Sequence, residues 1–487
     1  MKKLLFIVSF LFAVNLYSQN VQWSVESKLT ENILNSMYGT SGKYLGEIGN
    51  VDFYVFAQKV PSFFDFPEIV CSFIKVKDKK VIQSSKFTKE YMFIDVDIID
   101  KQIGILYYEE KSDDTISLLV DYYSLTTFEL EKTRTIFSFI SDDHIPNFVA
   151  YAASPDQGTK TILTQEINPE TEESELFIHV FDNSFYEKYY KSTPINFSKN
   201  QYLGKIQVFN NGPILFDIKS THDVSYNPVF NDAIFYLVDE SGLKQISLTD
   251  QSITNPSQIP KYDDIGYINI DKFQYKVVTS YNMCFRIFNL DFKNNFVSEP
   301  IVQSSNNGTW KIDNILRLSN GNQVFCFANR TIEINTQFLK ARTNSNKSIQ
   351  MICLDPNSDE IVYQTTLNRY HNVVEGSKSP FGNLKNIPFY TTNDDEVIVI
   401  YNTEPDLKKY IAVNGSDKAA VSEFDSKEVI TIFAKIDNLG FVRKKTILDS
   451  KDDKDKFIGV FSHLDKNEKI IVSKVKKSKM TFGIITQ

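Results

Sequence analysis

The sequence predicts an all-β chain that folds as a single closed β-propeller, and three observations support this prediction. Apolar runs alternate with short polar breaks, and helical periodicity is nearly absent. The polar breaks recur along the chain at similar distances. The last unit is one strand short, and one strand near the N-terminus has no partner. The content of 39 Phe and 25 Tyr fits this fold class, because both residues favour strands.

The strand pattern is clearest where apolar and polar residues alternate. Between Ile94 and Ile98, isoleucine and valine alternate with aspartate, so one face of that strand is apolar. Two short segments have helical spacing instead, Thr30 to Met37 and Glu333 to Ala341. The rest of the chain is expected to form strands and hairpins.

Eight polar turns recur, each before a strongly apolar strand. Their approximate centres lie at residues 49, 101, 156, 211, 271, 320, 394 and 466. Successive centres are about 50 to 75 residues apart, a length that holds the four strands of one propeller blade. The two longest units contain insertions, Thr331 to Lys347 and Glu404 to Ser426. Two tandem β-sandwiches are the alternative, but no Pro/Gly/Ser-rich linker divides the chain near its middle.

The ends of the chain predict how the ring closes. The last unit supplies three strands, near residues 457–463, 469–475 and 479–486, whereas Val21 to Ser27 precedes the first unit without a partner. An open ring leaves sheet edges unpaired, so we expect the N-terminal strand to complete the last blade. The prediction is one propeller domain over residues 19–487 with eight blades, and seven blades is the alternative.

The first residues predict export. Lys2 and Lys3 precede an apolar run from Leu4 to Val14, and Ser18 provides a small residue at a cleavage position. We expect residues 1–18 to be a signal peptide, because the apolar run is too short to span a bilayer. No later stretch has the length and hydrophobicity of a membrane span, so we expect no transmembrane segment in the mature chain.

Charge and cysteine content narrow the partners and the chemistry. Lys and Arg number 53 against 61 Asp and Glu, and the net charge of −8 argues against a nucleic-acid partner. Cys71, Cys284, Cys326 and Cys353 each lie in an apolar strand-like run, which predicts buried free thiols rather than zinc ligands. A disulfide between Cys326 and Cys353 is the alternative that an oxidising compartment permits.

No catalytic or metal-binding pattern stands out in the sequence. A G-x-S-x-G nucleophile elbow and an H-E-x-x-H zinc motif do not occur, and the five His residues are scattered. The acidic turn from Asp355 to Glu360 lacks the glycine and the distal glutamate of an EF-hand loop. We therefore expect no catalytic residue, no cofactor and no metal.

The export segment ends in Leu-Tyr-Ser-Gln-Asn, and a Lys-, Asn-, Ile- and Phe-rich all-β chain follows. In this combination the sequence resembles envelope proteins of the Bacteroidota, the flavobacteria among them. Asp114-Thr115-Ile116 also matches the short O-glycosylation acceptor pattern of periplasmic proteins in that phylum. The C-terminal residues look like a last propeller strand rather than the sorting domain of type IX secretion cargo. The resemblance implies a periplasmic protein that docks on an outer-membrane machine such as the type IX translocon. An extracellular location is the alternative.

A rigid ring that displays loops predicts a non-catalytic interaction module. The insertion from Glu404 to Ser426 is the expected docking element, because it combines apolar with charged residues: Lys408, Lys409, Tyr410, Ile411, Val413 and Asp417. The alternative is a carbohydrate-binding or glycan-cleaving propeller that uses its central funnel. An apolar patch on one face favours docking, whereas carboxylates or aromatic rings in the funnel favour the sugar-directed alternative.

Overall fold

The computed structural model describes most of the chain between Val21 and Ile485. The described residues are 21–28, 41–60, 68–89, 92–110, 115–140, 149–167, 174–194, 201–210, 212–221, 230–247, 264–281, 284–298, 301–304, 310–335, 341–355, 357–358, 360–374, 387–403, 430–449, 456–457, 462–465, 467, 469–476 and 479–485.

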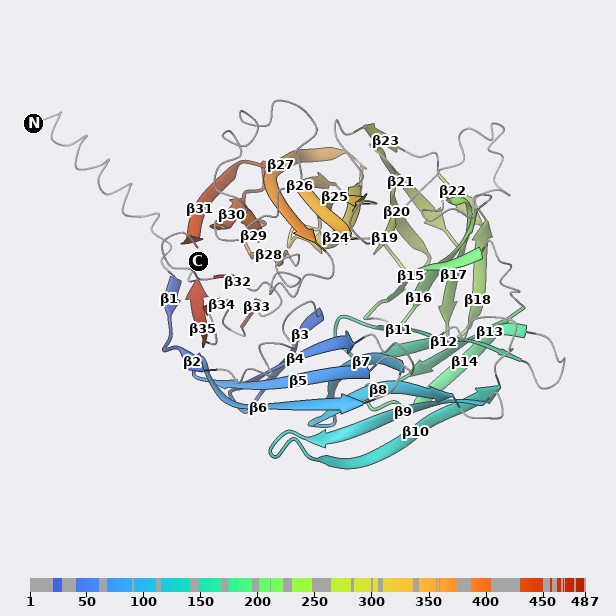
Figure 1. Cartoon of the computed structure of the whole chain (residues 1–487). Helices are drawn as coiled ribbons and strands as arrows, with labels where there is room; N and C mark the ends of the chain where they lie inside the picture. The colour runs from blue at the N-terminus through green and yellow to red at the C-terminus, as the bar shows by residue number, and fades with distance from the viewer. Residues whose placement is uncertain are drawn as a thin grey trace, which may run out of the picture.

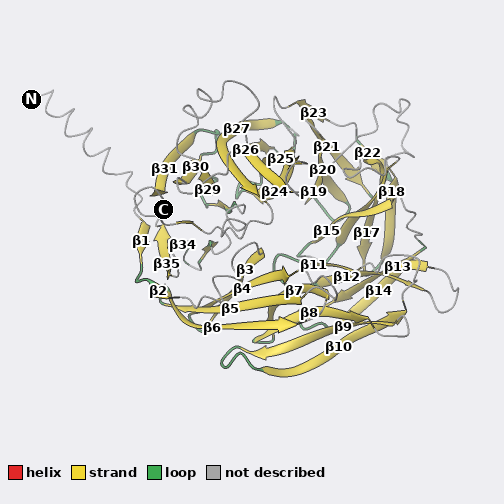
Figure 2. Ribbon diagram, viewed as in Figure 1, coloured by secondary structure: helices red, strands yellow, loops and turns green. Residues whose placement is uncertain are grey.

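These residues form eight antiparallel sheets that follow one another around a ring (Figure 1). Every regular element within the described ranges is a strand (Figure 2). Blade 1 consists of β3 (Ser41–Ile48), β4 (Val51–Val60), β5 (Glu68–Lys77) and β6 (Lys80–Lys89). Blade 2 consists of β7 (Met92–Ile99), β8 (Gln102–Glu110), β9 (Thr115–Ser124) and β10 (Leu130–Ile140). Blade 3 consists of β11 (Val149–Ala153), β12 (Lys160–Ile167), β13 (Ser174–Phe181) and β14 (Glu187–Thr193), and blade 4 consists of β15 (Gln201–Val208), β16 (Ile214–Thr221), β17 (Phe230–Asp239) and β18 (Gly242–Ser247).

The second half of the ring repeats this order. Blade 5 consists of β19 (Asp264–Asn269), β20 (Gln274–Tyr281), β21 (Cys284–Asp291), β22 (Phe296–Val297) and β23 (Ile301–Ser304). Blade 6 consists of β24 (Trp310–Arg317), β25 (Gln323–Asn335), β26 (Ala341–Leu354) and β27 (Ile361–Val374), and blade 7 of β28 (Phe389–Thr391), β29 (Val397–Thr403), β30 (Ile430–Ile436) and β31 (Val442–Asp449). Blade 8 consists of β32 (Lys456–Phe457), β33 (His463–Leu464), β34 (Ile470–Lys476) and β35 (Lys479–Ile485) together with β1 (Val21–Trp23) and β2 (Ser27–Lys28).

Within a blade the chain moves outward strand by strand. The first strands of successive blades contact one another, from β3 and β7 through to β24 and β28. The middle strands carry continuous apolar runs because neighbouring blades pack against both of their faces. β29 is buried along its whole length, for example.

The N-terminal segment closes the ring, as the strand count predicts. β1 and β2 both pair with β35, with Val21 opposite Ile485 and Ser27 opposite Met480. The same segment reaches blade 1, because the Ser24 hydroxyl donates to the carbonyl of Lys79 at 2.9 Å. The eight-bladed prediction is therefore confirmed, and the seven-bladed and tandem-sandwich alternatives are wrong.

The eight polar turns all join the first strand of a blade to its second strand. The first one lies between β3 and β4 and the last between β33 and β34. Asn50, Asp100 and Lys101 have positive φ values of 63°, 50° and 63°, which suits the tight turns of twisted hairpins. The polar turns that recur in the sequence are thus the turns of one hairpin in each blade.

The insertion in the sixth unit forms a hairpin extension rather than a helix or a separate loop. β25 runs on to Asn335, and β26 begins at Ala341, which lies opposite Asn335 in the register. The expectation of helical structure from Glu333 to Ala341 is therefore wrong for the described residues of that segment. The physical reason is that Thr331–Asn335 alternates β-branched and polar residues, a period-2 pattern that continues the ladder. The segment from Thr30 to Met37 lies outside the described residues.

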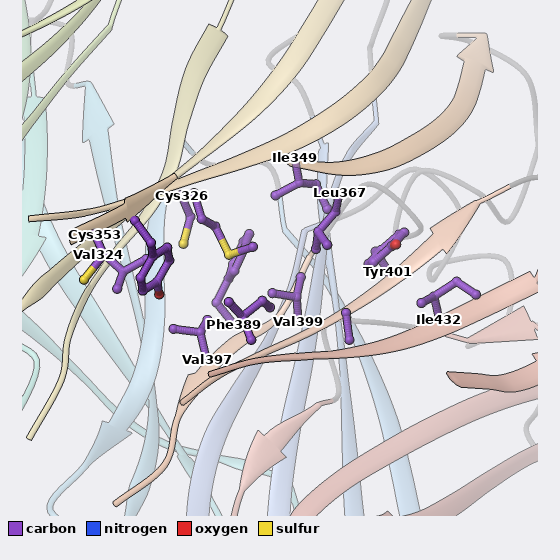
Figure 3. Close-up of a cluster of buried hydrophobic side chains, with 14 of the residues drawn as sticks. Val324, Cys326, Ile349, Cys353, Leu367, Phe389, Val397, Val399, Tyr401 and Ile432 are labelled. Atoms are coloured by element: carbon purple, nitrogen blue, oxygen red, sulfur yellow. The ribbon is translucent and has the colours of Figure 1, made fainter. Parts of the chain in front are cut away.

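Apolar side chains fill the space between neighbouring blades. Figure 3 shows one such cluster, in which Cys326 and Leu367 of blade 6 pack with Val399 and Ile432 of blade 7. Fully burying one such aliphatic side chain stabilises the fold by about 1.5–3 kcal/mol. The blades are therefore held together mainly by side-chain packing, since hydrogen-bonded ladders run within each sheet.

The thiols of Cys71, Cys326 and Cys353 are buried and free. Cys326 lies opposite Met351, so Cys353 is its diagonal neighbour in the register. Diagonal Cα atoms are about 7–8 Å apart, which exceeds the usual reach of a disulfide. The alternative of a Cys326–Cys353 disulfide is therefore wrong. The side chain of Cys284 lies outside what the structure describes.

We expect the thiols to resist alkylation in the native protein. Burial raises the pKa of Cys71 and of Cys353 to about 12, and a protonated buried thiol reacts poorly. After denaturation without reductant, all four cysteines of the chain should react in a thiol-counting assay read by mass spectrometry. Labelling of only two thiols after denaturation contradicts this prediction.

Candidate functional site

The predicted docking loop leaves the ring at a well-defined root. Lys408, Lys409, Tyr410, Ile411, Val413 and Asp417 all lie outside the described residues. The strand residues on either side of it are described, and Thr403 pairs with Ile430 as the last pair of β29 and β30. The chain therefore departs from and returns to adjacent positions on one end of blade 7.

A buried arginine holds this root. Arg369 on β27 of blade 6 is 1% exposed, and its Nε donates to the carbonyl of Asn402 at 3.1 Å. The hydroxyl of Thr431 donates to the side-chain oxygen of Asn402 at 2.9 Å. Because a buried guanidinium is costly without partners, these bonds fix the root against blade 6. Burial also raises the pKa of the neighbouring Tyr401 to about 12, although Arg369 acts in the opposite direction.

The opposite end of blades 1 to 7 carries two turns, one between the first and second strands and one between the third and fourth; in blade 8 only the first of these turns exists, because β35 and β1 come from the two ends of the chain. We call this side of the ring the turn face. Turns of adjacent blades bind each other: the Asp156 amide donates to Asn210 at 3.1 Å, and the Ser184 hydroxyl donates to Asp100 at 2.7 Å. On the far side of the ring, the Asn320 amide donates to Asp395 at 2.9 Å. These bonds link the turns of blades 2, 3 and 4 and those of blades 6 and 7 on the turn face.

One turn on this face presents two large apolar side chains to solvent. Leu439 and Phe441 follow β30 in the turn to β31, and each is 68% exposed. Gly440, which lies between them, packs against Tyr363 of blade 6. We call Leu439 and Phe441 the apolar patch.

The turn that carries the patch is locked in place. The Asp437 carboxylate accepts the amides of Leu439 at 3.0 Å and Phe441 at 2.9 Å. Gly440 has a φ of 84°, and a Cβ at this position would lie 2.8 Å from Tyr363. The carbonyl of Gly440 accepts the hydroxyl of Thr365 from blade 6 at 2.7 Å. The backbone that carries the two exposed apolar side chains is thus fixed in one conformation.

Two basic residues lie close to the patch in the sequence. Arg443 and Lys444 lie on β31, the outermost strand of blade 7, two and three residues after Phe441, and both are exposed. An apolar centre with a charged edge is the arrangement of a protein interface. The sequence signal was present in Asn438-Leu-Gly-Phe441, where apolar residues flank the turn glycine, but exposure could not be read from it.

Carboxylates beside the inner strands hold blades together. Asp217 on β16 is fully buried; it accepts the amide of Lys205 at 2.9 Å and the hydroxyl of Tyr267 from blade 5. Lys219 Nζ lies 4.0 Å from the same carboxylate. Gly204 makes this arrangement possible, because a Cβ there would lie 2.0 Å from a carboxylate oxygen.

A second buried pair joins blades 2 and 3. Lys160 Nζ lies 3.5 Å from Asp97 Oδ2, and the lysine also faces the ring of Phe185 at 4.7 Å. The second oxygen of Asp97 accepts the amide of Ile98 at 2.8 Å. Both Asp97 and Asp217 are thus engaged between blades, so they do not support the glycan-cleaving alternative.

Two classes of feature bear on metals and membranes. Within the described ranges, no group of three or more His, Cys, Asp or Glu residues is placed to hold a metal ion. In the same part of the chain, no helix combines the length and the hydrophobicity that crossing a membrane requires.

Comparisons with known proteins bear only on the fold. No family model and no curated protein matches the sequence. Among solved structures, the Dos1 propeller aligns over 96% of this chain and 95% of its own, at 9% identity and a TM-score of 0.42. The WD40 domain of SCAP from fission yeast aligns over 92% and 99%, at 8% identity and a TM-score of 0.35. The propeller domain of the Trilobed protease from Pyrococcus furiosus aligns over 90% and 98%, at 12% identity and a TM-score of 0.33.

Proposed function

We propose that this protein is a non-catalytic scaffold of the bacterial cell envelope that docks on a protein partner. The observation that carries the proposal is the apolar patch, in which Leu439 and Phe441 are each 68% exposed on a locked turn. Exposed apolar side chains are ordinary when they are scattered and mobile, but a fixed group with a polar rim is typical of interaction sites. Preorganisation also lowers the entropy cost of binding.

The chemistry of the patch defines the partner that fits it. An apolar pocket would receive Phe441 and Leu439, and acidic side chains at its edge would face Arg443 and Lys444. The predicted signal peptide and the resemblance to Bacteroidota envelope proteins support a periplasmic place, on an outer-membrane machine that serves protein transport. Fractionation of the source bacterium should recover the protein with periplasmic markers, and recovery with cytoplasmic markers contradicts this location.

The loop from Glu404 to Ser426 is a second docking element in this proposal. Its support is the rigid root, where Arg369 and Thr431 both bind Asn402. Lys408, Lys409, Tyr410, Ile411, Val413 and Asp417 supply the same mixture of apolar and charged groups as the patch.

Replacing Leu439 and Phe441 together by serine should abolish retrieval of the partner while leaving the melting temperature nearly unchanged. Anchors of this kind contribute on the order of 1–2 kcal/mol each, so affinity should fall by about 5- to 30-fold per residue. The measurement is cross-linked affinity purification from native membranes, quantified by mass spectrometry for each variant.

Ile82→Ser is the matched control, because Ile82 is an exposed apolar residue on blade 1. A protein that is retrieved equally by the parent and by the Leu439→Ser, Phe441→Ser double variant does not use the patch. Trimming residues 404–426 to a short Gly-containing turn tests the loop separately. If both altered proteins retrieve every parental partner in full yield, the docking proposal is wrong.

A further inference from the structure

The seam between blades 2 and 3 contains a continuous set of aromatic rings. Phe137 on β10 stacks on His179 of β13 with ring centroids 4.2 Å apart. Phe177 lies 6.1 Å from His179 and 6.2 Å from Tyr190 on β14. Tyr190 also lies 6.1 Å from His179, and it is 56% exposed. The tyrosine therefore has one side backed by other rings and much of its surface open to water.

Two carboxylates fix the histidine of this set. Nε2 of His179 lies 2.9 Å from Glu166 Oε1, and Nδ1 lies 3.2 Å from Glu187 Oε2. Glu166 also accepts the hydroxyl of Thr164. The side chain of Glu187 is 38% exposed, so it keeps acceptor capacity toward solvent. The seam thus combines a rigid aromatic base with a solvent-facing carboxylate.

A second exposed tyrosine continues the seam toward the turn face. The guanidinium of Arg134 on β10 lies 4.3 Å from the centroid of the Tyr186 ring, which is 63% exposed. Arg134 is itself held, because it donates to the carbonyls of Ser184 at 3.1 Å and Phe185 at 3.0 Å. Tyr186, like Tyr190, is therefore backed on one side and open on the other.

The two tyrosines lie along one strand direction. An irregularity in the register between Val180 and Phe181 gives β14 an extra residue, so that Glu187 lies opposite Phe181 and Tyr190 lies opposite His179. Both Glu187 and Tyr190 contact the ring of His179, which puts them on the side that meets Phe137 of blade 2. Four residues of fully extended chain span about 13 Å, and the extra residue of β14 makes the separation of Tyr186 and Tyr190 shorter than this.

We propose that this seam binds a neutral oligosaccharide. A pyranose presents a face of C–H groups, which packs on an aromatic ring, and an edge of hydroxyls, which hydrogen-bond to carboxylates. Tyr186 and Tyr190 supply two such rings, and Glu187 supplies acceptors between them. The carboxylates of Glu166 and Glu187 lie in the seam and would repel an anionic sugar, which favours a neutral one. The site lies on other blades than the apolar patch and does not rest on the docking proposal.

The test is a panel of neutral oligosaccharides, which includes cellohexaose, laminarihexaose, xylohexaose and mannohexaose, measured by isothermal titration calorimetry with the mature chain. We expect at least one member to bind, and Tyr186→Ala and Tyr190→Ala each to weaken that binding about tenfold. Phe296→Ala is the matched control, because Phe296 is an exposed aromatic residue of blade 5. Melting temperatures verify that each variant is folded.

Four outcomes overturn the inference. The parent protein binds no member of the panel; binding persists unchanged in both tyrosine variants; or Phe296→Ala weakens binding as much as they do. Binding that is stronger for a charged uronic-acid hexamer than for every neutral sugar also contradicts the neutral class. None of these outcomes alters the test of the apolar patch, since that test reads partner retrieval.

Discussion

Deletion of residues 19–28 should destabilise the entire ring, with a loss of roughly 3–5 kcal/mol. The deletion removes the ladder between β1 and β35, and it removes Trp23, which packs on Gly483. Each lost hydrogen bond contributes about 0.5–1.5 kcal/mol, and the loss of one large aromatic side chain from a packed site costs about 3–5 kcal/mol when it is fully buried. Trp23 is only half-buried, so its share is smaller. The edge of β35 would then be open to pairing with other chains.

Circular dichroism melts and light scattering measure both consequences. We expect a melting temperature at least about 5 °C below that of the parent, together with concentration-dependent association. Val25→Ser is the matched control, because Val25 lies in the same segment and is largely exposed. A deletion variant that melts within a degree or two of the parent and stays monomeric shows that the ring does not depend on this closure.

Asp217→Ala should have a comparable effect at a single position. The carboxylate is fully buried and binds the amide of Lys205 and the hydroxyl of Tyr267. Its removal takes an acceptor away from both donors, and it removes the carboxylate that lies 4.0 Å from Lys219 Nζ. Breaking a buried charge pair by removing one partner costs about 3–5 kcal/mol. Urea unfolding of the parent and the variant measures this difference.

Tyr267→Phe distinguishes the contribution of the Tyr267 hydroxyl from that of the Lys205 amide. It removes one hydroxyl and keeps the ring, so it should cost only about 1–2 kcal/mol. Adding Asp217→Ala to Tyr267→Phe should then cost less than Asp217→Ala alone, because the bond between the two residues has already been lost. Fully additive effects in this double-mutant cycle contradict the proposed bridge between blades 4 and 5.

The sequence alone predicted the features that act over a few residues. Polar turns with positive-φ positions such as Asn50 and Lys101 mark the hairpins, and apolar runs such as Val397–Tyr401 mark the buried middle strands. These signals are local, because turn chemistry and strand periodicity are set by neighbours in the chain. The count of strands then required a partner for Val21–Ser27, and β35 provides it.

The same local reasoning failed where the surroundings determine the outcome. The segment after Thr331 was read as an insertion with helical spacing, yet the ladder between β25 and β26 extends through it. A cross-strand partner is available only in the folded sheet, and pairing there outweighs weak helical spacing.

Only the tertiary structure decided what each surface presents. The exposure of Leu439 and Phe441, the burial of Arg369 beneath a loop root and the alignment of Tyr186 with Tyr190 depend on neighbouring blades. Arg369 reaches Asn402, and Phe137 reaches His179, across a blade interface. Contacts between residues that are tens of positions apart produce no periodic pattern in the sequence. The sequence determined a closed ring of eight blades because turns and strands depend on residues that are neighbours in the chain. Packing between blades determined the sites because it joins residues that are far apart in the chain.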